Sequence, residues 1–347
     1  MEITSPSSWF YEAGPCQDVV LASRARYARD LVNYRFPVTM NKDDEQEVES
    51  LIQDAFESIP NTPYQLLALN DLSPLDRRIL MERNIITQEF SVNPQKKVCM
   101  REDSRVFGTL NSQDHLRTAC IYSGLALRNA FDEIENLDKQ LEDHLDFAVS
   151  LDFGYLNSEI TNIGTGLRAS VMFHLPALVQ TNLIEKALKV VSQHGVSVKG
   201  FLSSDEHSLG NMYQISNTAS IGVSAEEILE KLEGIAEQLV NYERRAREEM
   251  LLKEKTRIED KVFRAYGILK YCRKISSSEA IDCISSVHLG KALGLIEEVD
   301  YQTLRPLLFL TQKAHVQKTI EDAEKEDEDK IDAARAEMIR KSLNKGL

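Results

Sequence analysis

Residues 164–176 read Gly-Thr-Gly-Leu-Arg-Ala-Ser-Val-Met-Phe-His-Leu-Pro, and this stretch carries the strongest information about the fold. From Arg168 to His174 the side chains alternate in character, which is the period of a β-strand with two different faces. Gly164 and Gly166 are compatible with an ordinary tight turn, or with backbone N–H groups that approach a phosphate. The stretch alone leaves both alternatives open.

A second arginine-bearing segment, Ala22-Ser23-Arg24-Ala25-Arg26, precedes this stretch. On a strand, Arg24 and Arg26 point to the same face, because side-chain direction repeats every two residues. Two guanidinium groups on one face repel each other unless an anion lies between them, and their forked donors match phosphate oxygens. The alternative is a pair of surface arginines that form salt bridges with acidic neighbours.

Two further segments complete the pattern. Residues 111–117 read Asn-Ser-Gln-Asp-His-Leu-Arg, and residues 209–217 read Leu-Gly-Asn-Met-Tyr-Gln-Ile-Ser-Asn. In this order and spacing, the four segments resemble the signatures of the bacterial protein-arginine kinases, a branch of the ATP:guanidino phosphotransferase (phosphagen kinase) family. Residues 262–269, Val-Phe-Arg-Ala-Tyr-Gly-Ile-Leu, extend the likeness toward the C-terminus, so that it covers nearly the whole chain.

The resemblance implies both a fold and a reaction. The implied fold class is α+β, an eight-stranded antiparallel sheet flanked by helices, followed by a C-terminal all-helical domain. The implied reaction transfers the γ-phosphoryl group of MgATP to arginine side chains of proteins, so ATP and Mg²⁺ are the expected cofactors. Phosphoryl transfer is mostly positioning and neutralisation of charge, and several arginines around the phosphates are the expected solution.

The resemblance also implies which residues contact the nucleotide. Lys199 stands where the family has a fifth arginine, and Asn84 stands where it often has a nucleotide-contacting histidine. The predicted cofactor-binding residues are Ser23, Arg24, Arg26, Asn84, Arg117, Arg168, Ala169, Ser170, Val171, Met172 and Lys199. No metal-binding side chain is predicted.

The acceptor side departs from the family pattern. A guanidinium group is a poor nucleophile because it is protonated, and the family surrounds it with two glutamates and a cysteine. In this chain Gln113 occupies the first glutamate position, Glu159 the cysteine position and Ser204 the second glutamate position. Glutamine can accept a hydrogen bond but cannot take a proton at neutral pH. Asp205 and Glu206 follow directly and offer nearby carboxylates.

Three interpretations of the acceptor side stay open. In the first, Glu159 with Asp205 or Glu206 rebuilds a carboxylate pair, and the chain phosphorylates arginine in proteins, with activity weakened by the substitutions. In the second, the chain is a catalytically impaired pseudokinase that binds a nucleotide or phosphoarginine as a regulator. In the third, the acceptor is a small guanidino compound. The additional C-terminal domain argues against the third, because small-substrate members generally lack it.

The C-terminal part contains a second predicted site. Residues 331–336 read Ile-Asp-Ala-Ala-Arg-Ala, which is similar to a family motif that binds phosphoarginine. Asp332 and Arg335 match that motif, whereas Ile331 replaces its leading arginine. The alternative is an ordinary amphipathic helix with a salt bridge between the two charged residues.

Local patterns predict α+β structure in the first part of the chain. Strands at 97–100 and 105–110 flank a charged turn and suggest a hairpin. Helices are predicted over 132–149 and 177–193, from apolar residues at helical spacing. Residues 1–15 are predicted to be a loosely structured lead-in.

The pattern changes in the second part of the chain. Ser224 and Glu227 form a capping box that opens a long helix running into a charged stretch. Beyond it, helical patterns follow one another without strand patterns, at 277–285, 287–295, 301–319 and 328–342. We therefore predict a guanidino-kinase-like phosphotransferase region over 1–255 and a helical domain over 256–347.

Composition limits the classes of partner. The net charge of −14 argues against nucleic acid as a partner. No apolar stretch approaches the ~20 residues that span a bilayer, and no secretory signal is visible, so a cytoplasmic protein is expected. Five cysteines without a CxxC pair support neither a disulfide framework nor a zinc site. From the resemblance we expect arginine-bearing protein substrates, an activator protein and a homodimer.

Overall fold

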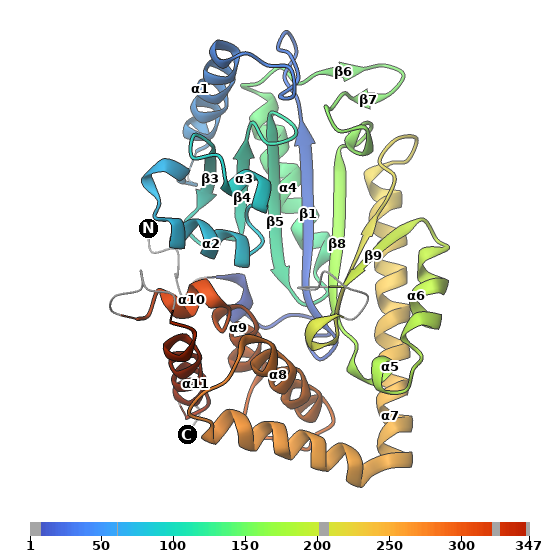
Figure 1. The fold of residues 1–347 in the computed structure, drawn as a ribbon. Coiled ribbons are helices and arrows are strands. Elements are labelled where there is room, and N and C mark those ends of the chain that lie inside the picture. The colour runs from blue at the N-terminus through green and yellow to red at the C-terminus, as the bar shows by residue number, and fades with distance from the viewer. Residues whose placement is uncertain (1–7, 61, 201–207, 321–326, 345–347) are drawn as a thin grey trace.

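The computed structural model describes residues 8–60, 62–200, 208–320 and 327–344. One large sheet has the strand order β2-β3-β4-β5-β1-β8-β10-β9, and all neighbouring strands are antiparallel (Figure 1). Its strands are β1 (Val20–Arg29), β2 (Tyr64–Ala68), β3 (Lys97–Arg101), β4 (Val106–Leu110), β5 (Leu116–Ser123), β8 (Leu167–His174), β9 (Val196–Gly200) and β10 (Met212–Asn217). A separate ribbon pairs β6 (Val149–Ser150) with β7 (Gly154–Tyr155). The sheet confirms the predicted fold class.

Helices flank this sheet and form the C-terminal part. The α-helices are α1 (Lys42–Ser58), α2 (Pro74–Glu82), α3 (Gln88–Ser91), α4 (Leu127–Glu142), α5 (Pro176–Gln180), α6 (Ile184–Ser192), α7 (Ala225–Tyr271), α8 (Ser277–Ala292), α9 (Tyr301–Leu310), α10 (Lys313–Gln317) and α11 (Glu328–Asn344). The 3-10 helices are η1 (Trp9–Tyr11), η2 (Leu69–Asp71), η3 (Ile160–Asn162) and η4 (Leu209–Asn211). No described helix is both long enough and apolar enough to cross a membrane.

The two faces of the sheet have different coverings. Helix α4 packs along β1 and β5, behind the sheet in Figure 1, whereas α2 and α3 lie in front of it. The ring of Tyr27 on β1 lies 6.3 Å from that of Phe131 on α4. Because side chains alternate along a strand, Tyr27 and the other odd-numbered residues of β1 face α4. The even-numbered residues, including Arg24 and Arg26, face the front.

Helix α7 begins as predicted and passes through the predicted domain boundary. Ser224 Oγ accepts the backbone N–H of Glu227, and the Glu227 carboxylate accepts the N–H of Ser224. At Glu254 the backbone is non-helical (φ −137°, ψ 34°), and Figure 1 shows the second part running beneath α8 and α11. The kink lies beside the predicted division at residue 255, whereas the independence of the two parts stays a prediction.

The structure corrects several predicted helix limits. The helix predicted over 132–149 is α4, which ends at Glu142, and Val149 already belongs to β6. The helix predicted over 177–193 is divided into α5 and α6, because Asn182 between them has the left-handed φ of 56°. In the C-terminal part, α8 is continuous through two predicted helices, and the region predicted as 301–319 forms the separate helices α9 and α10.

The lead-in is not loosely structured where the structure describes it. Trp9 and Phe10 of η1 are buried, and both rings contact Phe309 of α9, at 5.3 and 5.5 Å between centroids. Arg305, also on α9, is fully buried and donates to Ser123 Oγ at 2.8 Å. The N-terminal segment therefore lies between the sheet and the C-terminal helices, a contact between distant parts of the chain that local patterns do not contain.

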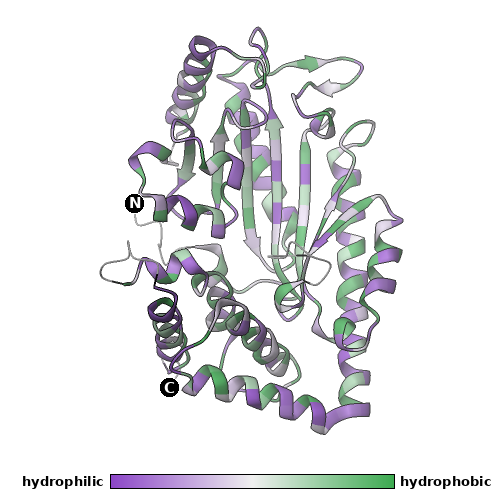
Figure 2. Cartoon of the chain, viewed as in Figure 1, coloured by the Kyte–Doolittle hydropathy of each residue, from purple (hydrophilic) through white to green (hydrophobic). Residues whose placement is uncertain are grey.

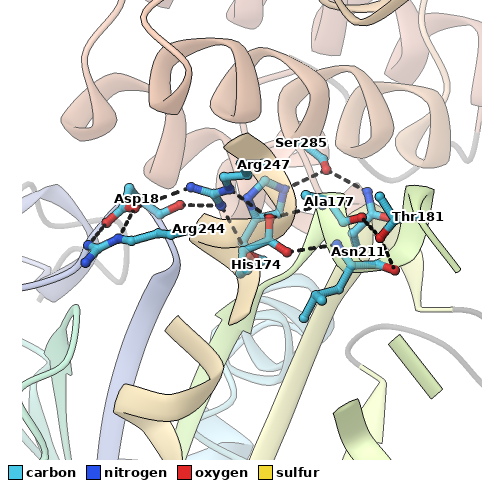
Figure 3. A network of polar contacts seen from close by, with 10 residues as sticks. Asp18, His174, Ala177, Thr181, Asn211, Arg244, Arg247 and Ser285 are labelled. Atoms are coloured by element: carbon cyan, nitrogen blue, oxygen red, sulfur yellow. Dashed lines mark hydrogen bonds and ion pairs between the residues drawn. The ribbon is translucent and has the colours of Figure 1, made fainter. Parts of the chain in front are cut away.

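A polar network joins the sheet to α7 (Figure 3). Arg247 donates from Nε to Glu243 at 2.8 Å and from Nη2 to the backbone carbonyl of Asp18 at 2.9 Å. The fully buried Glu243 accepts the backbone N–H groups of Ala177 and Leu178 at the start of α5, both at 3.0 Å. Glu243 therefore satisfies free donors of a helix N-terminus while its charge is balanced by Arg247.

Two buried histidines extend this network to α8. His174 Nε2 lies 2.7 Å from Ser285 Oγ, which also accepts from Asn211 Nδ2 at 3.0 Å (Figure 3). The His174 and His288 rings lie 4.6 Å apart. Burial holds the pKa of His174 well below its usual value and lowers that of His288 to about 3, and the Arg247 charge adds to both shifts. Both imidazoles are therefore neutral in the folded protein at neutral pH.

This pair predicts a loss of stability in acid. Each imidazole takes up a proton below pH 6.5 when the chain unfolds, whereas the folded state resists protonation, so its stabilisation is present above that pH and lost below it. Burial raises the pKa of Asp30 to about 7, so this carboxyl group makes the folded state more stable as the pH falls, opposite to the histidines. The effect of the histidines is therefore measured by comparison with a variant. The unfolding free energy of the wild type should fall by about 1.5–2 kcal/mol more between pH 6.5 and 5 than that of His288→Phe.

Urea unfolding at pH 6.5, 6 and 5 measures this difference. The comparison uses slopes, so a constant stability cost of His288→Phe does not affect it. Equal slopes for the two proteins would show that His288 takes up its proton as readily in the folded state as in the unfolded chain.

Candidate active site

Four arginines point to the front face of the sheet. In the strand register, Arg26 lies opposite Arg168 on β8, and Ala28 lies opposite Arg117 on β5. Residues 24, 26 and 28 share one face of β1, so Arg24, Arg26, Arg117 and Arg168 all share it as well. Figure 2 shows the result as hydrophilic bands within the otherwise hydrophobic central strands. The structure thus brings together the four arginines that the sequence singled out.

These arginines are desolvated and poorly neutralised. The Nε atoms of Arg24 and Arg26 are inaccessible to solvent and have no hydrogen-bond partner among the described residues. Neither these two side chains nor Arg168 forms an ion pair with a described carboxylate. Burial lowers the pKa of Arg24 to about 10 and that of Arg26 well below its usual value, and the Arg117 charge adds to both shifts. An anion of high charge is the ligand that would relieve this repulsion.

Neighbouring side chains orient two members of this cluster. Arg117 donates from Nε to the fully buried Asp114 at 2.9 Å. Arg168 donates to Ser216 Oγ at 3.1 Å and to Ser197 Oγ at 3.4 Å. Ser216 on β10 pairs with Ser170 on β8 and with Ser197 on β9, so the three serines form a row across the sheet. Sequence patterns did not single out Asp114, Ser197 or Ser216, because only the strand register shows that they contact the arginines.

Asn84, which the resemblance places among the nucleotide contacts, lies against Arg24. Its backbone carbonyl accepts from Arg24 Nη1 at 3.2 Å, and its φ of 57° is a conformation that asparagine tolerates. Two small cavities of about 50 and 40 Å³ adjoin Arg24; Asn84 lines the first, and Ile85, Ile86, Thr87 and Phe90 line the second. A pocket for a small organic ligand usually exceeds ~300 Å³. Neither cavity is large enough to hold a nucleotide beside Arg24.

The other predicted nucleotide contacts divide between the two faces. Ser170, Met172 and Lys199 share the arginine face, with Lys199 exposed near its end. Ser23, Ala169 and Val171 point their side chains to the opposite face, because adjacent residues of a strand alternate. Ser23 Oγ instead donates to the backbone carbonyl of Gly124 at 2.8 Å and is fully buried. Any nucleotide contact of these three residues would have to come from the backbone.

The acceptor-side residues lie on two adjoining segments. Gln113 is exposed in the turn before β5, and the backbone N–H of Glu159 donates to Asp114 Oδ1 at 3.2 Å. The Glu159 carboxylate lies close enough to Arg168 to oppose the lowering of the Arg168 pKa that burial causes. Ser204 and Asp205 lie outside the described residues. Glu159 is thus an acidic residue near the arginine cluster, in addition to Asp114, which pairs with Arg117.

Two buried aspartates hold these segments together, and the sequence analysis missed both. Asp30 accepts the backbone N–H groups of His115 and Ser158, each at 2.7 Å. Asp114 accepts from Asn162 Nδ2 at 2.8 Å in addition to Glu159 and Arg117. Each carboxylate therefore links the turn at 111–115 to the segment at 157–162. Polarity alone gave no signal for this role, because ordinary surface aspartates look the same in a sequence.

In the second predicted site, that of Asp332 and Arg335, the side chains make contacts within the fold. Arg335 on α11 is buried and donates to the backbone carbonyls of Thr311 and Ile275 at 2.7 and 2.8 Å. It also pairs with Asp332, and Ile331 is buried beside them. These contacts join α11 to the segments before α8 and after α9. Binding of phosphoarginine by Asp332 and Arg335 stays a prediction.

Two protein-family models match successive parts of the chain. Residues 47–246 match the ATP:guanido phosphotransferase C-terminal catalytic domain, and residues 255–346 match the Protein-arginine kinase McsB C-terminal domain. A curated relative, Protein-arginine kinase of Geobacillus stearothermophilus, is 38% identical over 98% of this chain and 94% of its own length. The Protein-arginine kinase of Bacillus subtilis (strain 168) is 37% identical over 97% of this chain and 93% of its own.

Solved structures share the fold at lower identity. Lombricine kinase matches with a TM-score of 0.58 and 19% identity over 70% of each chain. The duplicated taurocyamine kinase from Schistosoma mansoni, with bound transition state analog components, matches with a TM-score of 0.57 and 19% identity, over 66% of this chain and 33% of that one. The fold is that of a guanidino phosphotransferase. By these matches the chain belongs to the ATP:guanidino phosphotransferase family, in its protein-arginine kinase branch.

Proposed function

We propose that this protein transfers the γ-phosphoryl group of MgATP to the guanidinium groups of arginine side chains in proteins. The observation that carries the proposal is the cluster of Arg24, Arg26, Arg117 and Arg168, four cations on one face of the sheet, of which only Arg117 pairs with a described carboxylate, that of Asp114. Charge spreads over the transferred phosphoryl oxygens in the transition state, so fixed guanidinium groups stabilise it. The two relatives named Protein-arginine kinase agree with an arginine acceptor in a protein.

Magnesium would enter with the nucleotide. Among the described residues, no group of three or more His, Cys, Asp or Glu side chains is arranged to hold a metal ion. Mg²⁺ usually keeps several waters and binds through substrate phosphates with one or two carboxylates. When bound, it would neutralise part of the phosphate charge, in the same way as the arginines beside it.

Glu159 is our candidate for the acceptor clamp. An acceptor guanidinium must be oriented in line with the γ-phosphate and must lose a proton as the N–P bond forms. Glu159 is held by Asp114 beside Arg168, so its carboxylate can pair with the acceptor at the edge of the phosphate site. The exposed Gln113 can orient the acceptor by accepting a hydrogen bond, but it cannot take the proton.

A second candidate function is a nucleotide-binding regulator with little transfer activity. The glutamine at position 113 favours it, because a positioned general base is commonly worth roughly 10²–10⁴ in rate. A regulator of this kind would bind a nucleotide through the arginine cluster but would form no phosphoarginine. Dimerisation and dependence on an activator protein remain expectations from the family.

Mass spectrometry for phosphoarginine tests the proposal. The purified protein is incubated with MgATP and an unfolded, arginine-bearing protein, and the products are kept at non-acidic pH. Wild type should form phosphoarginine, whereas Arg168→Ala should form far less and bind ATP more weakly by roughly 1.5–3 kcal/mol, the range for charged hydrogen bonds. If the wild type bound ATP but formed no phosphoarginine, the protein would be the nucleotide-binding regulator. Unchanged ATP affinity in Arg168→Ala would show that the arginine cluster does not bind the nucleotide.

A further inference from the structure

A groove of about 660 Å³ lies between helices α6 and α7, away from the candidate active site. Helix α6 packs on β9, the edge strand at the far end of the sheet from β2, so this α6–α7 groove lies on the opposite side of the molecule from α1 (Figure 1). None of the four arginines at the front of the sheet lines it. The groove is also far larger than either cavity beside Arg24.

Both walls of the groove present apolar residues at helical spacing. They are Leu183, Ala187 and Val190 on α6 and its N-cap, and Tyr242, Ala246 and Met250 on α7. Spacings of three and four residues place such side chains along one face of each helix. A helix that packs between two others fits into facing stripes of this kind.

The floor of the groove is small and buried, whereas its rim is large and exposed. Ala187 and Ala246 are buried, but Leu183, Val190 and Tyr242 are 44%, 39% and 40% exposed. Alanines on the floor leave holes into which large apolar side chains of an occupant can insert. A small ligand is usually enclosed over most of its surface, so an open groove with an apolar rim fits a helix better.

Hydrogen bonds within the fold set the position of the two walls. Glu243, next to Tyr242 on α7, accepts the backbone N–H groups of Ala177 and Leu178 at the start of α5. Leu178 itself lines the groove, and the left-handed residue Asn182 turns the chain from α5 into α6. The walls are therefore ordered before an occupant arrives, which lowers the entropic cost of binding.

The groove carries an excess of positive charge. Its two carboxylates, those of Glu249 and Glu254, are already paired with basic residues of α7. Lys186 and Arg245 also line it, and neither forms an ion pair with a described residue. In a chain with a net charge of −14, two cations without such a partner beside an apolar groove are complementary to an acidic occupant.

We propose that the α6–α7 groove binds an acidic amphipathic helix of a partner protein. The occupant would place large apolar side chains over Ala187 and Ala246, and aspartate or glutamate beside Lys186 and Arg245. From Tyr242 to the last lining residues of α7 the groove extends over about 16 Å, or three helical turns. The inference goes beyond the proposed function and does not depend on it, because the groove shares no residue with the arginine cluster.

Fluorescence anisotropy with a model peptide tests the groove in the full-length protein. The probe is a fluorescein-labelled peptide of about 15 residues, with leucine at three- and four-residue spacing and glutamate between, a length at which isolated helices are marginal. Lys186→Glu/Arg245→Glu should raise its Kd roughly 10-fold, about 1.4 kcal/mol. The matched control is Lys189→Glu/Lys231→Glu, which changes the net charge equally on the same two helices but outside the groove. The control should bind the peptide as the wild type does.

Two further measurements separate the apolar and the charged contributions. Leu183→Ser/Val190→Ser should also weaken binding of the glutamate peptide, because both side chains form the exposed rim. Added salt should weaken binding to the wild type and shrink its difference from the charge-reversed variant. A peptide with lysine in place of glutamate should lose no affinity when Lys186 and Arg245 are reversed. Circular dichroism should show that the glutamate peptide gains helix on binding.

Three results would overturn the inference. The first is no binding of the glutamate peptide to the wild type, or equal affinity for the wild type and the charge-reversed variant. The second is binding of decanoate, lost in the charge-reversed variant, without binding of the peptide, which would make the groove a site for small amphipathic anions. The third is a change of oligomeric mass in that variant, measured by sedimentation, which would make the groove a self-association surface.

Discussion

Arg26→Met is expected to weaken MgATP binding by roughly 1.5–3 kcal/mol, the range for hydrogen bonds to charged groups, while leaving the protein as stable as wild type or more stable. Arg26 lies opposite Arg168 on the sheet and forms no ion pair with a described carboxylate. Burial lowers its pKa, and Arg117, Arg24 and Arg168 lower it further. Methionine has a similar length and no charge, so it removes this repulsion together with the phosphate contact.

Calorimetric titration with MgATP and a thermal unfolding curve measure the two effects. Arg128→Met is the matched control, because Arg128 pairs with Glu226 at the exposed surface. The control should bind ATP normally and lose at most ~1 kcal/mol of stability, as for other surface ion pairs. If Arg26→Met bound ATP normally and unfolded more easily, the cluster would be a structural feature rather than a phosphate site.

Glu159→Gln is expected to lower phosphoarginine formation by roughly 10²–10⁴, the usual contribution of a positioned acid–base group, with little change in ATP affinity. The carboxylate lies near enough to Arg168 to raise its pKa, and the backbone of Glu159 is held by Asp114. The change removes only the charge and the proton acceptor, so the nucleotide contacts that we propose for Arg168 should be retained. Gln113→Glu alone should give a small gain, because two acidic groups near one another raise each other's pKa.

A combined variant distinguishes the active protein from the regulator. If Glu159 is not a working clamp, Gln113→Glu with Ser204→Glu and Glu159→Cys should exceed the wild type and every single variant, since catalytic groups act as a unit. A phosphoarginine assay on wild type, the single variants and the triple variant decides between the two. If the wild type forms phosphoarginine at least as fast as the triple variant, and Glu159→Gln forms it slowly, then Glu159 is the acceptor clamp.

Local patterns were sufficient for the central features of the fold. The alternation after Gly166 predicted β8, and the capping box at Ser224 predicted the start of α7. The hairpin predicted at 97–110 is the pair β3 and β4. Such features depend on residues close in sequence, whose periodicity and hydrogen bonding are the same in any context.

Helix limits were predicted less well, because contacts between distant residues decide them. Asn182 ends one helix by adopting left-handed backbone between α5 and α6, and the N-terminus of α5 is satisfied by Glu243 from α7. The break between α9 and α10 likewise follows packing, since Glu82 of α2 accepts the backbone N–H of Ala314 at 2.7 Å at the start of α10. Neither partner lies near the helix in the sequence.

For the candidate site, the sequence by itself determined which arginines belong together, because Arg24 and Arg26 share a strand face and the family signatures supply Arg117 and Arg168. Only the tertiary structure decided what surrounds them. Strand register placed Arg168 opposite Arg26 and turned Ser23 away to the other face. Long-range hydrogen bonds gave the aspartates at positions 30 and 114 their role of joining the acceptor segments. Register and burial depend on which distant strands pair, and the order of residues along one strand does not contain that information.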